Sequence, residues 1–113
     1  MKLGDIYLLQ GPGYGSKPRP VVIIQSDRYV YDSEVVCLLT SFNRSEDELS
    51  VAIQPSPLNG LEKPSWAICD KTIAFQKEYF DKKIGVLTSE EMHQIRKRLI
   101  RLFEITEEDF SPE

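Results

Sequence analysis

Three polar segments between apolar stretches carry side chains that can act on a phosphate or a hydroxyl group. Arg19 stands between two prolines, which favour a stiff, extended backbone at this position. Its guanidinium is a permanently charged, bidentate donor of the kind that suits a phosphate. Thr40 and Ser41 end an apolar stretch and offer two hydroxyl donors. Asp70 and Lys71 interrupt another such stretch and supply a carboxylate and an ammonium group for acid–base chemistry.

Each of these features also has a purely structural interpretation. Arg19 can pair with a surface carboxylate, the hydroxyl pair can form a turn, and Asp70 with Lys71 can form a solvated ion pair. The Gly-rich segment 11–18 leads into a strand rather than a helix, so it is not a nucleotide-binding loop. It predicts either a simple hairpin connection or a flap over a site.

Metal and histidine chemistry is not expected. The chain has one histidine, His93, which excludes a two-histidine ribonuclease and a histidine-based metal site. Neither a metal-ligand spacing nor a nucleophile elbow is present, so no cofactor is predicted. The two cysteines, Cys37 and Cys69, have no histidine nearby and are predicted to be reduced core residues.

Composition places the chain among ordinary globular proteins. It has 113 residues, 41% apolar and 28% charged, which favours one domain with its own core. No apolar run approaches the ~20 residues of a membrane span, and the N-terminus lacks a signal-peptide core, so a cytoplasmic protein with no membrane partner is expected. The net charge of −4 argues against a protein that coats RNA, but a selective site needs only a local cationic patch.

The elements that must position these residues are mostly strands. Runs of strand-forming residues bounded by turn residues predict strands at 3–10, 19–26, 34–40, 49–54, 65–70, 72–76 and 83–87. Thr88 and Glu91 predict a capping box at the start of a C-terminal amphipathic helix. The fold class is therefore mostly β with a C-terminal helix: a small, curved, mainly antiparallel sheet or barrel. Residues 1–105 are expected to form the domain and 106–113 a frayed acidic tail.

The order and spacing of several motifs resemble the MazF/PemK (Kid) toxins of bacterial toxin–antitoxin systems. The resemblance covers roughly residues 3–105 and combines several short segments: Gly4-Asp5-Ile6-Tyr7, the Gly-rich loop, Arg19-Pro20-Val21-Val22-Ile23-Ile24-Gln25, Leu39-Thr40-Ser41, Asn59-Gly60-Leu61, Cys69-Asp70-Lys71 and Ile84-Gly85-Val86-Leu87.

This resemblance implies an SH3-like barrel, a homodimer, and a metal-independent endoribonuclease that cuts single-stranded mRNA at short sequences. It also implies inhibition by an antitoxin whose disordered, acidic and apolar segment occupies the RNA site. By position, Arg19 and Thr40 match catalytic residues of the family, and Asp70 matches a position that some members use as a base. Lys17, Ser41, Lys71, Arg44, Tyr14 and Phe42 are the expected substrate contacts, and Phe75 can either stack on a base or belong to the core.

Two other classes remain open from the sequence. One is a toxin of the same fold that poisons DNA gyrase, as CcdB does; the C-terminal segment typical of CcdB is absent here. The other is a protein-interaction module of SH3-like shape, which needs an aromatic groove for proline-rich peptides. The aromatic residues of this chain are scattered, so the nuclease is the favoured interpretation.

Overall fold

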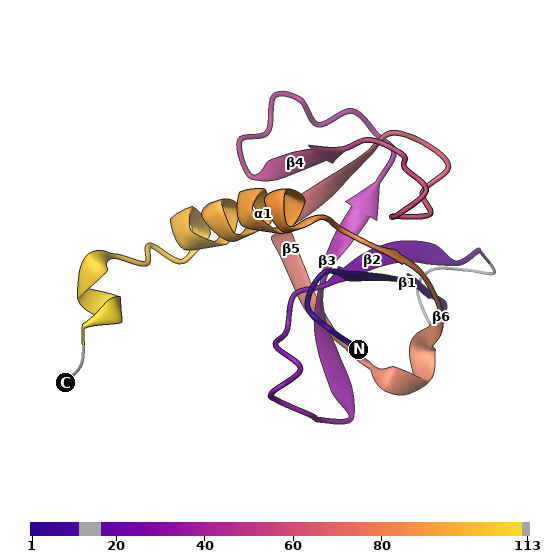
Figure 1. Ribbon diagram of the computed structural model, residues 1–113, viewed down its shortest axis with the longest axis horizontal. Helices are drawn as coiled ribbons and strands as arrows, with labels where there is room; N and C mark the ends of the chain where they lie inside the picture. Colours follow the sequence, from indigo (N-terminus) through magenta and orange to yellow (C-terminus); the bar gives the residue numbers. More distant parts are fainter. Residues whose placement is uncertain (12–16, 112–113) are drawn as a thin grey trace.

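The fold is one strongly curved antiparallel sheet with a helix on its edge (Figure 1). A computed structural model describes residues 1–11 and 17–111. Within them the sheet has six strands in the order β4-β5-β3-β2-β1-β6. The elements are β1 (Asp5–Leu9), β2 (Arg19–Ile23), β3 (Ser33–Thr40), β4 (Ser50–Ile53), β5 (Ser65–Gln76), η1 (Lys77–Tyr79), β6 (Phe80–Val86), α1 (Ser89–Leu102) and η2 (Glu107–Phe110).

The predicted strands are present, but one prediction about them is wrong. Residues 65–70 and 72–76 are not two strands; they form the single strand β5, which pairs with the whole of β3. Between the pairs Cys37↔Thr72 and Leu38↔Ile68 the register shifts, so residues 69–71 form a bulge. A bulge takes up an extra residue without ending a strand. In the sequence, the polar Asp70-Lys71 pair therefore resembles a connection between two strands, although the hydrogen-bonded ladder continues on both sides of it.

The core explains why β2 contains three consecutive buried apolar residues, Val21, Val22 and Ile23. Successive side chains of a strand point to opposite faces, and both faces of β2 are covered. Val22 belongs to a cluster that also holds Cys37, Cys69 and the helix residues Met92 and Ile95. Val21 and Ile23 belong to a second cluster, against which Phe75 packs. Phe75 is thus a core residue rather than a stacking platform.

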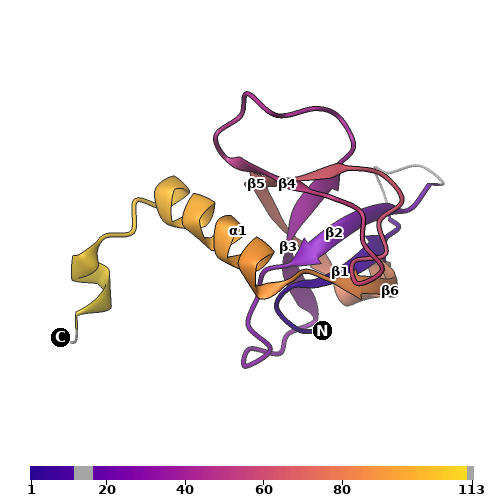
Figure 2. The same ribbon diagram turned by 45° about the horizontal axis from the view of Figure 1, so that its top comes forward.

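Helix α1 begins as the sequence predicts. The Thr88 hydroxyl accepts from the Glu91 amide at 3.1 Å, and the Glu91 carboxylate accepts from the Thr88 amide at 2.9 Å. The helix packs on β4 and β5 through its first half and then projects away from the sheet (Figure 2). Its predicted apolar stripe is consequently only partly buried, and Phe103 at its end is 61% exposed. No helix in the described residues is long and apolar enough to span a membrane.

The acidic tail is more ordered than the sequence suggests. Residues 107–110 form the short 3-10 turn η2, which stands clear of the sheet in Figure 1. Thr106 caps this turn: its amide donates to the Asp109 carboxylate at 2.7 Å. Within the described part of the tail, this local capping box starts one exposed turn that buries no residue.

The connection between β4 and β5, which we call the 54–64 loop, completes the barrel. β4 and β6 are the two edges of the sheet, and this loop spans from one edge to the other. The amide of Val86 in β6 donates to the carbonyl of Leu58 at 3.0 Å. Leu61 packs against the apolar core, whereas Leu58 is half exposed. The loop therefore covers one open end of the barrel, where the candidate site lies.

Candidate functional site

A groove of about 560 Å³ lies at the end of the barrel where β2 begins and β3 ends. Strands β1, β2, β3 and β6 and the 54–64 loop all contribute to its lining, which consists of Leu8, Lys17, Pro18, Arg19, Pro20, Leu39, Thr40, Ser41, Phe42, Gly60, Leu61, Glu62, Lys63, Ser65, Lys82 and Ile84. Five of the predicted site residues are thus brought together: Lys17, Arg19, Thr40, Ser41 and Phe42.

The register of β2 against β3 places Arg19 and Thr40 in the same part of the groove. Val21 pairs with Leu38, and continuing this antiparallel register by two residues sets Arg19 opposite Thr40. Arg19 is the first residue of β2 and is exposed, while Thr40 is the last residue of β3 and is half-buried. A guanidinium and a hydroxyl at adjoining strand ends can both donate to one anion.

Electrostatically the groove is cationic, although the whole chain is acidic. Its lining carries Lys17, Arg19, Lys63 and Lys82 against one carboxylate, that of Glu62. In the part of the chain that the structure describes, none of these five charged groups has an ion-pair partner (the ion pairs found there are Arg44–Asp47, Lys71–Asp70, Lys77–Glu34 and Lys83–Asp5). Unpaired cations in a concave site leave their charge available to an incoming anion.

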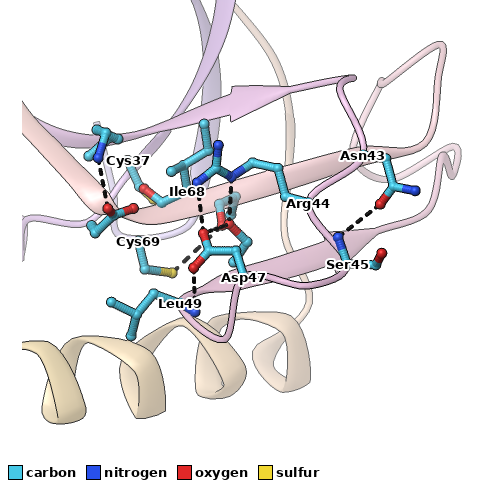
Figure 3. A network of polar contacts seen from close by, with 12 residues as sticks. Cys37, Asn43, Arg44, Ser45, Asp47, Leu49, Ile68 and Cys69 are labelled. Carbon is cyan, nitrogen blue, oxygen red and sulfur yellow. Dashed lines mark hydrogen bonds and ion pairs between the residues drawn. The ribbon is translucent and has the colours of Figure 1, made fainter.

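Arg44, predicted to contact phosphate, does not line the groove. Its guanidinium donates to the Asp47 carboxylate at 2.8 Å and to the Ser50 hydroxyl at 3.1 Å (Figure 3). Asp47 also accepts from the Ser50 hydroxyl at 2.6 Å and the Leu49 amide at 3.1 Å. These bonds, those from Ser50 and Arg44 first, lower the pKa of Asp47 from 3.8 to about 2. Arg44 therefore holds the loop between β3 and β4 in shape.

Asp70 and Lys71 also lie outside the groove. They occupy the bulge of β5, where the Lys71 ammonium is 2.7 Å from the Asp70 carboxylate. Thr40 pairs with Trp66, four residues before Asp70, so the separation along β5 is about 13 Å. The second oxygen of Asp70 is buried without a hydrogen-bond partner. This distance along β5 keeps the carboxylate away from Arg19 and Thr40 within one chain. Tyr14 lies outside the described residues.

The two cysteines are buried, free thiols of the core, as predicted. The Cys37 thiol donates to the Ile68 carbonyl at 3.0 Å. A hydrogen bond with Cys69, together with burial, raises the pKa of Cys37 well above its usual range, while the same bond lowers the pKa of Cys69. His93 is exposed on α1, and the described residues contain no group of three metal-ligating side chains. The groove itself offers cations, hydroxyls and a single carboxylate.

Sequence reasoning missed one wall of the groove, formed by Glu62, Lys63 and Lys82. These residues lie on the 54–64 loop and on β6, and only the docking of that loop brings them together. Asn59 organises the loop: its side-chain oxygen accepts from the amides of Ser56 and Leu61, both at 3.0 Å, and its amide group donates to the Gln54 carbonyl at 2.8 Å. The Asn-Gly dipeptide was visible as a turn signal, but not the surface on which the turn docks.

The chain is similar in sequence to known proteins. The sequence profile of the family described as PemK-like, MazF-like toxin of type II toxin–antitoxin system matches residues 2–103. The chain is 32% identical to the probable endoribonuclease MazF of Mycolicibacterium smegmatis, over 88% of this chain and 94% of that protein.

Solved structures share the fold at lower identity. An endoribonuclease in complex with its cognate antitoxin from a mycobacterial species has a TM-score of 0.78 at 22% identity, covering 94% of this chain and 97% of that one. The Mycobacterium tuberculosis toxin MazF-mt6 has a TM-score of 0.76 at 23% identity, covering 90% of this chain and 98% of that one. A MazE–MazF structure from Deinococcus radiodurans has a TM-score of 0.76 at 16% identity, covering 94% of this chain and 97% of that one. The expected fold class is confirmed, and the chain belongs to the family of PemK-like, MazF-like toxins of type II toxin–antitoxin systems.

Proposed function

We propose that this MazF-like endoribonuclease toxin binds single-stranded RNA in the groove and cleaves it without a metal ion. The observation that carries the proposal is the Arg19 guanidinium, which has no ion-pair partner among the described residues and shares with Thr40 a groove lined by four cations and one carboxylate. The match to a protein named as a probable endoribonuclease supports it. RNA supplies its own nucleophile, the 2′-hydroxyl, so the protein needs only to position the phosphate and move protons.

The reaction proposed is attack of the 2′-oxygen on the adjacent phosphorus. A bond from the 2′-oxygen to phosphorus forms and the bond to the 5′-oxygen breaks. The products are a 2′,3′-cyclic phosphate and a 5′-hydroxyl. Arg19 binds the scissile phosphate and stabilises the charge that develops on it, and the hydroxyls of Thr40 and Ser41 donate to its oxygens. The 2′-proton passes to a base, and the leaving oxygen takes up a proton delivered by way of the Arg19 guanidinium or water.

Two carboxylates are candidates for the base. The family resemblance assigns this role to Asp70, which lies outside the groove, further along β5 and beside Lys71. The geometry favours Glu62, because it lines the groove itself. Paired variants decide between them: the loss of the true base, as Asp70→Asn or Glu62→Gln, is expected to lower kcat by about 10²- to 10⁴-fold, and the loss of the other is not.

The proposal also covers the stacking of an RNA base, the binding of an antitoxin and the formation of a homodimer. Phe42 is 81% exposed beside the groove and offers a flat surface on which a base can stack. Structures of related toxins include complexes with their antitoxins. We extend this to the present chain: an acidic segment of a cognate antitoxin occupies the cationic groove, and the toxin acts as a homodimer.

The direct test is cleavage of a long RNA by the purified protein in EDTA, followed by mapping of the new ends. Discrete cuts with 5′-hydroxyl ends are expected. Arg19→Ala should retain the wild-type circular dichroism spectrum and lose about 10²- to 10³-fold in kcat, the usual effect of removing one positioned donor. Arg96→Ala, an exposed arginine on α1, is the matched control. Intact RNA at high wild-type concentration, or full activity of Arg19→Ala, would contradict the proposal.

A further inference from the structure

We propose that Lys63 and Lys82 form a second phosphate-binding wall, which holds the RNA backbone at phosphates next to the scissile one. This inference rests on the proposed function and extends it from one phosphate to a stretch of chain. Both lysines line the groove, on the 54–64 loop and on β6 respectively, whereas Arg19 and Thr40 belong to β2 and β3. The groove therefore has cations from separate elements, which is what an extended polyanion requires.

Lys82 faces the groove because of its place on β6. The neighbouring Lys83 pairs with Tyr7, and its ammonium lies 3.3 Å from the carboxylate of Asp5. Lys82 and Ile84, on either side of Lys83, both line the groove, whereas Lys83 and Asp5 do not. One of two consecutive lysines is thus neutralised by an ion pair and the other is left available in the groove.

Lys63 is held near β6 by close backbone packing. Gly60 has a positive φ of 68°, and a Cβ at this position would collide with the Ile84 carbonyl. A Cβ on Gly85 would come within 2.5 Å of the carbonyl oxygens of Leu58 and Asn59. Only glycine at both positions permits this approach, which sets the 54–64 loop directly against β6. The wall is therefore a fixed feature of the fold.

The environment of the two lysines points to phosphate rather than to a structural role. In the described chain neither ammonium has an ion-pair or hydrogen-bond partner, and both side chains are exposed. Two other lysines form ion pairs with buried carboxylates. Lys77 pairs with Glu34 and Lys83 with Asp5, whose side chains are only 4% and 8% exposed. An ammonium group is a compact charge that binds phosphate without demanding a fixed orientation, as backbone contacts to a flexible single strand require.

The test measures how RNA binding depends on salt. The probe is an oligoribonucleotide that spans a mapped cleavage site and carries a 2′-deoxy sugar there, so that it binds without being cut. Each phosphate neutralised by a lysine contributes about 0.7 to the slope of log K against log salt concentration for a single strand. Lys82→Gln and Lys63→Gln should each reduce the slope by about 0.7, and the double variant by about 1.4.

Kinetics give a second readout. Each variant is expected to raise KM about tenfold, since a charge-assisted bond to phosphate contributes about 1.5 kcal/mol or more, and to leave kcat unchanged. Lys97→Gln, an exposed lysine on α1, should change neither slope nor KM. Thermal melting of every variant confirms folding, which loss of an unpaired surface charge should not affect.

The outcomes separate this inference from the proposed function. A wild-type salt slope and KM in the double variant would overturn the second wall while leaving cleavage at Arg19 intact. A loss of kcat with unchanged KM and slope would also overturn it, because the lysines would then act on the chemical step. Failure of the wild-type protein to cut any RNA would overturn both.

Discussion

Asn59 organises the loop that forms one wall of the groove, so Asn59→Ala tests how far the shape of the groove depends on this side chain. The side chain is 1% exposed and makes three hydrogen bonds to the backbone of its own loop, with Ser56, Leu61 and Gln54. Alanine would remove all three bonds and leave two amides and one carbonyl without their partner. Water can replace some of these bonds, because the neighbouring backbone is only partly buried.

The expected loss follows from the number of bonds. At about 1 kcal/mol net for each bond, the substitution should cost about 3 kcal/mol of the free energy of unfolding. For a domain of this size that corresponds to a decrease in Tm of roughly 10 °C. The loop would then separate more readily from β6, so the salt slope of RNA binding should also fall towards that of Lys63→Gln.

Urea denaturation followed by circular dichroism measures the change. The matched control is Asn43→Ala, which removes a single side-chain bond, to the Ser45 amide at 2.8 Å, from an exposed loop. It should cost no more than about 1 kcal/mol. If Asn59→Ala also costs less than about 1 kcal/mol, then Asn59 does not hold the loop and the argument for a rigid wall is wrong.

Three further predictions follow from single side chains. Gly85→Ala should destabilise the protein and weaken RNA binding, because its Cβ meets backbone carbonyls that cannot rotate away; a Tm and KM equal to wild type would contradict this. Thr40→Val should lower kcat and, because the Thr40 hydroxyl accepts a hydrogen bond from the Phe42 amide at 3.2 Å, should also lower Tm slightly; unchanged turnover would make Thr40 a turn residue only. Since the pKa of Asp47 is lowered to about 2 in the folded protein, its carboxylate stabilises the fold above pH 3.8 and this stabilisation is lost as pH falls towards 2. Asp47→Asn should therefore be less stable than wild type at neutral pH, in urea denaturation, with the difference disappearing between pH 3.8 and 2; a constant difference would refute the assignment.

Local patterns predicted most of the elements correctly for physical reasons. The capping box of α1 depends on residues three positions apart, so Thr88 and Glu91 suffice to identify it. The apolar run Val21–Ile23 of β2 reflects burial on both faces of the sheet at this strand. Arg19 was identified by its backbone restraint and its match to the family, and the structure places it in the groove.

The sequence predictions about the site were weaker wherever a residue's role depends on its partners in space. Arg44 and Lys71 are predicted substrate contacts, yet each forms an ion pair with a nearby carboxylate, that of Asp47 and that of Asp70 respectively. Lys82 and Lys83 are equivalent in the sequence. The pairing of β6 with β1 distinguishes them, because it sets Lys83 beside Asp5.

By itself, then, the sequence determined the strands, the capped helix and the family, because these depend on local periodicity and on motifs in a fixed order. The tertiary structure decided which charges meet. The register of β2 on β3 brought Arg19 and Thr40 into one groove, and the pairing of β5 with β3 placed Asp70 four residues along the strand from the partner of Thr40. The packing of two glycines set the 54–64 loop against β6 and so added the second row of cations. Strand register, bulges and the docking of a loop depend on contacts between segments far apart in the chain. Local sequence patterns therefore do not predict them.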